Sequence, residues 1–295
     1  MLDFKNIMIS DKVWIDELLK HSDFRGAEYC FTNLFIWDEV YHSKITRYKD
    51  FLLFTSGSGD TARYLFPPGK GDVKEAIELL EADAIERNVK FVLIGLSAQT
   101  KIQLETMCPG KYDFTVERNS FDYIYEREKL VSLAGKKLQS KRNHLARFRE
   151  LPGWEYEDIT EQNLQECINY SNDWCKLNGC GENLSLMLEC CAVNKALAHY
   201  SELKLRGGLL RLDGKVVAYT VGEPLNSDTV IVHIEKADSE IRGSYPMINR
   251  EFAERLSEGY VYINREDDAG DEGLRKAKNS YYPVFMQEKY SAIKK

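Results

Sequence analysis

The sequence is poor in the residues that build metal sites and disulfide frameworks. It has five histidines in 295 residues, and none stands at metal-ligand spacing from another histidine or from a cysteine. Its seven cysteines form an odd set without a Cys-x-x-Cys pair. We therefore expect no structural metal, and we expect reduced cysteines that are mostly buried.

Long apolar runs are also missing. The longest uncharged ones, such as residues 91–97 and 229–234, are far shorter than the roughly 20 residues that a membrane helix needs. Charges at Asp3, Lys5 and Asp11 interrupt the first apolar stretch, unlike a secretory signal. With 40 Lys and Arg against 47 Asp and Glu, the formal charge of −7 argues against general adhesion to nucleic acid or anionic lipid. We expect a cytoplasmic protein whose basic patches are local.

Length and composition predict two globular cores. A chain of 295 residues lies at the upper limit of what one core supports, and 43% hydrophobic with 29% charged residues is typical of folded proteins. Residue periodicity in the first half predicts helices, an antiparallel meander, a helix capped by Asp72, and then alternating strands and helices. The expected helices are 11–20, 29–40, 72–85 and 97–107, and the expected strands are 43–48, 51–56, 64–66, 90–96, 114–118 and 122–125.

The second half repeats this order, and Asp213-Gly214 supplies a strong signal for a hairpin. The expected helices are 162–177, 182–200, 244–256 and 271–280, and the expected strands are 204–212, 215–222, 229–236, 260–264 and 284–289. The repetition predicts an α+β protein with two tandem domains, 1–128 and 152–295, joined by a basic connecting helix at 129–151. Each domain should hold a mixed, mostly antiparallel sheet flanked by helices.

Three segments carry a family resemblance: GKKLQSKRNHLARF (135–148), VHIEKADSEIRGSYPMINREFA (232–253) and INREDDAGDEGLRKAKNSYYPV (263–284). Together with the repeated element order, they resemble stand-alone proteins related to the C-terminal domain of phosphatidylglycerol lysyltransferase. In that group, as in Fem-type proteins, two GNAT-like acyltransferase domains stand side by side. The resemblance covers most of the chain, and the last segment is its most specific part.

The resemblance implies transfer of an activated acyl or aminoacyl group to an amine or hydroxyl acceptor, with no tightly bound cofactor. The donor would be an acyl-CoA or an aminoacyl-tRNA. A GNAT cradles coenzyme A with backbone N–H groups of a glycine-rich helix start, but Arg242-Gly243-Ser244-Tyr245-Pro246 keeps one glycine and adds a proline without N–H. This departure favours aminoacyl-tRNA. The alternative is a non-catalytic module that binds tRNA, a nucleotide or an anionic head group.

Glu235 is the candidate general base. It lies near the end of the predicted strand 229–236, where a carboxylate beside an apolar cleft can act through a water. The resemblance implies that this strand diverges from the strand that ends at Asn264, so that the donor enters between them. The alternative for Glu235 is a salt bridge at the strand end with Lys236 or Arg242.

Further donor-binding candidates lie at two helices of the second half. Arg242, Gly243, Ser244 and Tyr245 surround a helix start, where free N–H groups and a guanidinium can bind an anion. The alternative is an ordinary helix start in which Ser244 satisfies its own backbone. Lys278, in the helix 271–280, is counted with Asn264 among the donor-binding candidates.

Tyr281 and Tyr282 stand where the resemblance implies a phenolic acid for the leaving group. The alternative is a core tyrosine with a satisfied hydroxyl. The acidic residues 266–272 before them suit the positive end of a helix dipole, or else attract a cationic acceptor.

Residues 136–149 form the sharpest local charge anomaly, because they hold six Lys and Arg without an acid. Leu138, Leu145 and Phe148 would anchor one helical face while the cations point outward. We interpret the segment as a phosphate-contacting helix for tRNA, a nucleotide or a lipid head group; a solvated helix between domains is the alternative. The candidate phosphate- or RNA-binding residues are Lys137, Lys141, Arg142, His144 and Arg147.

Overall fold

The computed structural model describes residues 2–295, which divide into two compact units. The first unit runs to Asp122 and adds Asp267–Asp271 and Met286–Lys295, and the second consists of Tyr123–Glu266 and Glu272–Phe285. The boundaries expected from sequence, at 128 and 151, differ from this division, because each unit takes up strands from distant parts of the chain. The basic segment falls inside the second unit.

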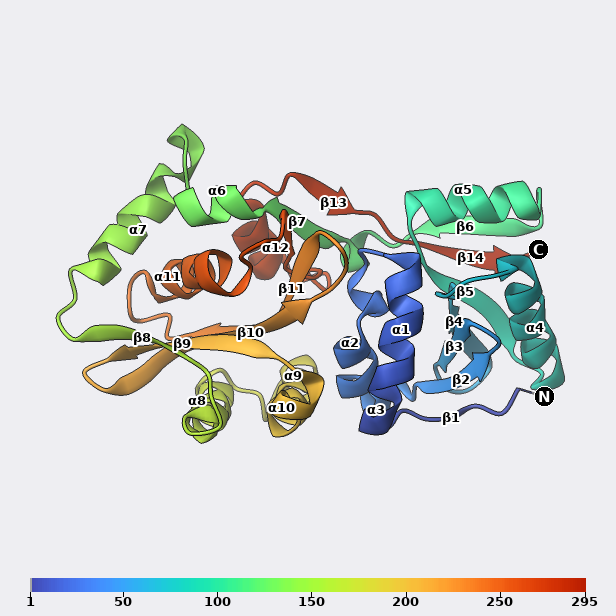
Figure 1. The fold of residues 1–295 in the computed structure, drawn as a ribbon, viewed down its shortest axis with the longest axis horizontal. Helices are drawn as coiled ribbons and strands as arrows, with labels where there is room; N and C mark the ends of the chain where they lie inside the picture. Colours follow the sequence, from blue (N-terminus) through green and yellow to red (C-terminus); the bar gives the residue numbers. More distant parts are fainter. Residues whose placement is uncertain (1) are drawn as a thin grey trace. The chain divides into compact units, whose positions relative to one another are not determined.

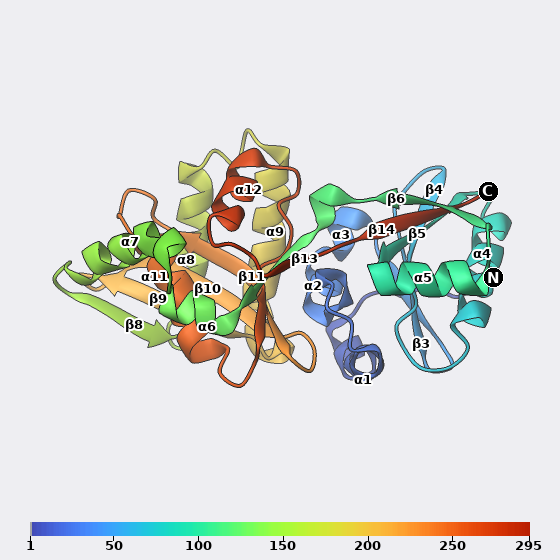
Figure 2. The same ribbon diagram turned by 90° about the horizontal axis from the view of Figure 1, so that it is seen from above.

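The first unit holds a seven-stranded sheet with the order β1-β2-β3-β4-β5-β14-β6 (Figures 1 and 2). The pair β4–β5 is parallel, and the other neighbours are antiparallel. The strands are β1 Lys5–Asn6, β2 Lys44–Tyr48, β3 Phe51–Ser56, β4 Thr61–Leu65, β5 Lys90–Leu96, β6 Tyr112–Val116 and β14 Tyr290–Lys294. The helices are α1 Lys12–Ser22, α2 Phe31–Ile36, α3 Asp38–Tyr41, α4 Val73–Glu86 and α5 Ala98–Met107.

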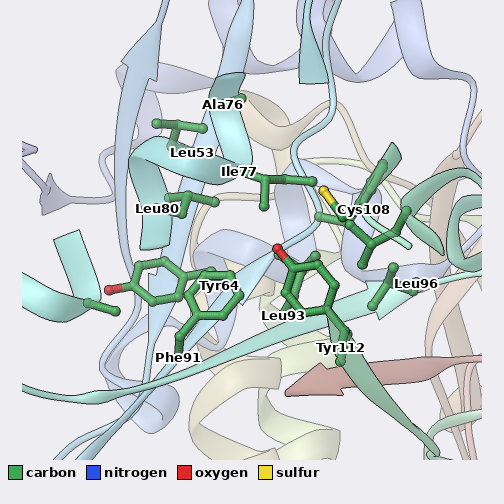
Figure 3. Packing of buried hydrophobic residues seen from close by; sticks show 14 of the residues in the cluster. Leu53, Tyr64, Ala76, Ile77, Leu80, Phe91, Leu93, Leu96, Cys108 and Tyr112 are labelled. Atoms are coloured by element: carbon green, nitrogen blue, oxygen red, sulfur yellow. The ribbon is translucent and has the colours of Figure 1, made fainter. Parts of the chain in front are cut away.

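Helix α4 covers this sheet for a reason that is visible in its sequence. Asp72 caps it by accepting hydrogen bonds from the backbone N–H groups of Lys74 and Glu75, as predicted. Its apolar stripe, which includes Leu80 and Ala84, then packs on β3 and β5. Figure 3 shows this core, in which Tyr64 and other aromatic rings fill the space between the helix and the strands.

The second unit holds a sheet with the order β13-β7-β12-β11-β10-β9-β8. The pair β11–β12 is parallel, whereas β7–β12, β10–β11, β9–β10 and β8–β9 are antiparallel. Its strands are β7 Asp122–Glu126, β8 Trp154–Asp158, β9 Arg206–Leu212, β10 Lys215–Pro224, β11 Thr229–Ala237, β12 Tyr262–Asn264 and β13 Phe285–Gln287. The helices are α6 Arg127–Ser132, α7 Gln139–Arg149, α8 Leu164–Leu177, α9 Leu184–Ala198, α10 Tyr200–Leu203, α11 Ser244–Glu251 and α12 Glu272–Asn279.

Two mixed, mostly antiparallel sheets flanked by helices confirm the predicted fold class. In the second unit α8 and α10 lie on one face of the sheet and α11 lies on the other (Figure 1). The predicted hairpin is present, and Asp213 and Gly214 both adopt positive φ, at 49° and 75°, as a type I′ turn requires. A π-helical turn, Phe252–Leu256, extends α11 toward the expected helix end.

Several expectations on local structure are wrong. The strand expected at 284–289 is β13 followed by the separate strand β14, which lies between β5 and β6, far from its neighbours in sequence. The helix expected at 29–40 is broken into α2 and α3, and β8 was not foreseen. The cysteines are not all reduced: Cys175 and Cys180 form a disulfide, because the short connection after α8 brings their Cα atoms within 5.2 Å.

Candidate active site

The two parallel strands of the second unit separate after a short pairing. Strand β12 pairs with β11 through three residues, from Thr229↔Tyr262 to Ile231↔Asn264. Strand β11 continues to Ala237, whereas the chain after Asn264 stays with β7: Arg265 N–H donates to the carbonyl oxygen of Tyr123 at 3.0 Å. The predicted divergence is therefore present, and it exposes one edge of the last part of β11 to side chains from other elements.

The parallel pair of the first unit behaves differently. Strands β4 and β5 pair through five residues, from Thr61↔Lys90 to Leu65↔Ile94, and the backbone hydrogen bond from Phe66 to Ile94 continues the ladder beyond the end of β4. This pair leaves no comparable separation. Of these two parallel pairs, the one in the second unit has the separation that a site between diverging strands needs.

Glu235 lies where β11 and β12 have separated, and two side chains hold its carboxylate. Nη2 of Arg265 donates to Oε1 at 2.8 Å, and Nδ2 of Asn249 donates to Oε2 at 3.0 Å. The side chain of Glu235 is 12% exposed and that of Arg265 is 11% exposed. The ion pair foreseen as the alternative for Glu235 is present, but with Arg265 instead of Lys236 or Arg242. Since an ionised carboxylate offers about four lone-pair sites, these two bonds leave acceptor capacity for a ligand.

Aromatic rings and a lysine complete the cluster around this ion pair. The guanidinium carbon of Arg265 lies 5.0 Å from the ring centre of Tyr281 and 5.7 Å from that of Tyr125. Nζ of Lys141, from α7, lies 4.0 Å from the ring centre of Tyr281. We call Lys141, Glu235, Asn249, Arg265 and Tyr281 the β11 cluster.

Burial and charge shape the titration of the cluster. Burial and the nearby charge of Arg265 lower the pKa of Lys141, while Glu235 opposes that shift. Burial raises the pKa of Tyr281, against the effect of Arg265. Tyr281 therefore keeps its proton at neutral pH, and Lys141 gives up its proton more readily than a lysine in water.

Two polar atoms of the cluster are buried without a hydrogen-bond partner among residues 2–295. They are Nη1 of Arg265, a donor, and Oδ1 of Asn249, an acceptor. Asn249 is 2% exposed. Each such atom costs about 1–3 kcal/mol when it is left unpaired, so the two atoms beside one carboxylate make the β11 cluster a candidate binding site.

The helix start at Arg242–Tyr245 has contacts of a structural kind. Gly243 has φ +96°, and an added Cβ would lie 2.3 Å from the carbonyl oxygen of His144, so glycine permits close packing of α11 on α7. Oγ of Ser244 donates to the carbonyl oxygen of Asp238 at 2.6 Å, and Ser244 does not cap the helix. Burial raises the pKa of Tyr245, while hydrogen bonds to the Ala237 backbone and the Trp174 side chain oppose that shift. These contacts favour the structural alternative for this segment.

The basic segment divides into an inner and an outer set. Lys141 points to Tyr281, and Nη1 of Arg142 donates to the carbonyl oxygen of Gly135 at 2.8 Å. His144 is half-buried. The exposed cations of the segment are Lys136, Lys137, Arg147 and Arg149, and Lys137 lies 5.1 Å from the ring centre of Tyr282. Leu138, Leu145 and Phe148 are buried as predicted.

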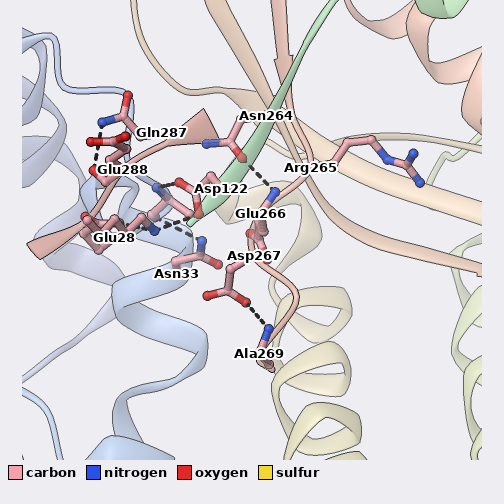
Figure 4. A network of polar contacts seen from close by, with 12 residues as sticks. Glu28, Asn33, Asp122, Asn264, Arg265, Glu266, Asp267, Ala269, Gln287 and Glu288 are labelled. Atoms are coloured by element: carbon pink, nitrogen blue, oxygen red, sulfur yellow. Dashed lines mark hydrogen bonds and ion pairs between the residues drawn. The ribbon is translucent and has the colours of Figure 1, made fainter. Parts of the chain in front are cut away.

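The remaining predicted residues shape the chain after β12. Asn264 is fully buried, and its Oδ1 accepts a hydrogen bond from the backbone of Glu266 at 2.7 Å; Figure 4 shows this turn, with the Arg265 side chain directed away from it. Nζ of Lys278 donates to the carbonyl oxygen of Arg265 at 2.6 Å. Tyr282 is 46% exposed, whereas Tyr281 is 6% exposed. Of the two tyrosines, Tyr281 lies in the β11 cluster.

Sequence reasoning missed Arg265, Asn249 and Tyr125. Arg265 directly follows Asn264, so its position at a strand end was a usable signal. Asn249 lies one turn into a helix with no distinguishing pattern, and Tyr125 reads as an ordinary strand residue. Only the packing of α11 and β7 around β11 brings them to Glu235.

The sequence matches a known family along nearly its whole length. The family described as "Phosphatidylglycerol lysyltransferase, C-terminal" matches residues 19–293. The chain belongs to this family. The predicted resemblance is confirmed.

The chain is also similar to two proteins of unknown function and shares its fold with a third protein. A conserved protein of unknown function from Bacteroides thetaiotaomicron is 42% identical, with a TM-score of 0.95 and full coverage of both chains. An uncharacterised protein of Mycoplasmoides gallisepticum is 30% identical over 215 residues, which is 70% of this chain and 67% of that protein. The structure of L-PGS from Bacillus licheniformis shares the fold at 13% identity, with a TM-score of 0.70 over 100% of this chain and 94% of that one. Within residues 2–295, no helix combines the length and apolarity needed to cross a membrane.

Proposed function

We propose that this protein is an aminoacyltransferase that moves an aminoacyl group from aminoacyl-tRNA to an amine acceptor at the β11 cluster. The observation that carries the proposal is the separation of β11 and β12, which leaves the carboxylate of Glu235 beside unpaired polar atoms. Membership of a family described by a lysyl transfer reaction supports this class of chemistry.

The transfer needs a base for the acceptor and an acid for the leaving group. The acceptor nitrogen attacks the carbonyl carbon of the aminoacyl ester, so that a C–N bond forms and the ester C–O bond breaks. Glu235 takes the proton that leaves the nitrogen. Tyr281, which burial keeps protonated, gives a proton to the departing ribose oxygen. Solvent then returns the proton to Tyr281 and removes the one on Glu235.

The choice of donor rests on the helix start and on α7. Gly243 packs against the backbone of His144, and Pro246 has no N–H. The start of α11 therefore has few free N–H groups that could donate hydrogen bonds to the pyrophosphate of coenzyme A. The exposed cations Lys136, Lys137, Arg147 and Arg149 suit the phosphates of an RNA. These features support aminoacyl-tRNA over acyl-CoA. They also favour the second candidate, a module that binds tRNA without chemistry.

The Glu235→Gln variant separates these possibilities. We expect the wild-type protein to transfer label from a mixture of charged tRNAs to a pool of small amines. Glu235→Gln should lower turnover by about 10²–10⁴-fold with tRNA binding unchanged, because it removes the base and keeps the shape. Glu258→Gln, at an exposed position of the same unit, is the matched control.

Other outcomes would decide against parts of the proposal. Unchanged turnover in Glu235→Gln would remove Glu235 as the base. Turnover with acyl-CoA and none with charged tRNA would show that the donor is acyl-CoA and not aminoacyl-tRNA. Binding of tRNA without turnover of either donor would favour the non-catalytic module.

A further inference from the structure

The β11 cluster carries more positive than negative charge. Lys141 and Arg265 are its cations, and Glu235 is its carboxylate. Within residues 2–295, no carboxylate lies at ion-pair distance from Nζ of Lys141, which instead faces the ring of Tyr281 at 4.0 Å. A partly buried cation without an ion pair is unfavourable, and an anion from outside the chain would relieve this.

The two unpaired atoms define what such an anion should look like. Nη1 of Arg265 can donate a hydrogen bond to an oxygen, and Oδ1 of Asn249 can accept one from an N–H or O–H group. Both side chains use their other terminal atom to hold Glu235, so the free donor and the free acceptor flank the same carboxylate. A ligand that satisfies both must present an acceptor and a donor close together.

We propose that the β11 cluster binds the acceptor as a small amino acid, with its carboxylate on Lys141 and Nη1 of Arg265 and its amine on Oδ1 of Asn249. The amine then lies beside Glu235, as the transfer requires. This inference rests on the proposed function for the role of the ligand as acceptor, but the binding itself is independent of transfer.

The free acceptor atom, Oδ1 of Asn249, separates an amino acid from a lipid acceptor. Phosphatidylglycerol has a phosphodiester that the two cations can also attract, but it has no amine, so it offers Oδ1 of Asn249 only hydroxyl groups as donors. A lysyl side chain brings a further cation toward Lys141 and Arg265, which repel it. On this proposal the cluster prefers a free amino acid to the lipid acceptor that the family's description implies.

Calorimetric titration of the full-length protein tests this proposal, with L-alanine as the probe. L-alaninamide lacks the carboxylate, propionate lacks the amine, and inorganic phosphate is an anion of another shape. We expect L-alanine to bind, and each of the other three to bind at least about tenfold more weakly, since a lost charge-assisted hydrogen bond has about that effect. Lys141→Met should weaken L-alanine binding by about tenfold or more, whereas Lys215→Met, at an exposed position of the same unit, should not change it.

Four results would overturn the proposal: no binding of L-alanine at millimolar concentration, equal binding of L-alaninamide, tighter binding of phosphate, or unchanged binding in Lys141→Met. Circular dichroism checks the fold of the variant, and Lys141→Gln replaces it if Lys141→Met does not fold. The titration contains no aminoacyl donor, so its result does not depend on whether the protein is a transferase. If L-alanine binds but no transfer occurs, the amino acid site stands and the transferase proposal is wrong. If the protein transfers the aminoacyl group to hydroxyl acceptors and does not bind L-alanine, the amino acid site is wrong and the transferase activity stands.

Discussion

Replacing Lys289 with methionine should destabilise the first unit by about 3–5 kcal/mol, because the change removes the cation that pairs with a buried carboxylate, Asp122, and a half-buried one, Glu28. Nζ of Lys289 lies 2.7 Å from Oδ1 of Asp122 and 2.7 Å from Oε2 of Glu28. Asp122 is fully buried and Lys289 is 10% exposed. Figure 4 labels both acids of this network, which holds together residues from three distant parts of the chain.

The magnitude follows from these distances. At an effective dielectric constant of about 20, each attraction over 2.7 Å is worth roughly 6 kcal/mol before desolvation is counted. Burial of the three charges and repulsion between the two acids cancel much of this. Removing the cation leaves both acids without their neutralising charge, although Asp122 keeps a hydrogen bond from the backbone N–H of Ala27 at 2.8 Å. Losses of about 3–5 kcal/mol are typical when one partner of a buried ion pair is removed.

The loss should depend on pH in a definite direction. Burial alone would lower the pKa of Lys289, but Asp122 and Glu28 raise it, so Lys289 keeps its charge at neutral and acidic pH, and its own titration removes stability only at high pH. Burial raises the pKa of Glu28 against the effect of Lys289, so removing the lysine raises that pKa further. In Lys289→Met, folding then takes up protons in mild acid. The variant should therefore recover part of its stability between pH 7 and pH 5.

Urea unfolding at pH 7 and pH 5, followed by a probe in the first unit, measures both effects. With a slope of about 2 kcal/mol per molar urea, the midpoint should fall by about 2 M at pH 7 and by less at pH 5. Lys295→Met, whose lysine is 51% exposed in its ion pair with Asp113, should change stability by less than about 1 kcal/mol. A loss below about 1 kcal/mol in Lys289→Met, or a greater loss at pH 5 than at pH 7, would refute the reasoning.

Two further predictions concern α7. Gly243→Ala should lower the free energy of unfolding by at least about 2 kcal/mol, because a Cβ would meet the carbonyl oxygen of His144 at 2.3 Å with φ at +96°. Gly214→Ala, with φ +75° and nothing within 4 Å, isolates the conformational part in the same thermal or urea assay, and equal losses in the two variants would contradict the packing argument. Arg147→Glu should weaken tRNA binding about three- to tenfold and reduce the slope of log K against log salt concentration by about 1–2, whereas Lys215→Glu should change neither. Filter binding at several salt concentrations measures both quantities. Equal effects of the two variants would show that α7 does not contact the RNA.

Local features of this protein could be predicted from its sequence, because short-range chemistry decides them. Asp72 and Glu75 mark the start of α4, and Asp213-Gly214 demands a tight hairpin whatever surrounds it. The repeated order of helices and strands indicated an α+β protein with two sheets, and three sequence segments together with that order indicated the family. Glu235 was singled out by its place at a strand end, and the divergence of β11 and β12 is present as expected.

Tertiary structure alone decided what Glu235 and its neighbours contact. Periodicity states which face of an element is buried but not which distant element covers that face, so Arg265, Asn249 and the inward turn of Lys141 could not be foreseen. For the same reason the pairing of β14 with β5 and β6 was missed. Residue type and spacing determined the elements of this protein, whereas the free energy of packing them together determined its site, because that free energy depends on contacts between residues far apart in the chain.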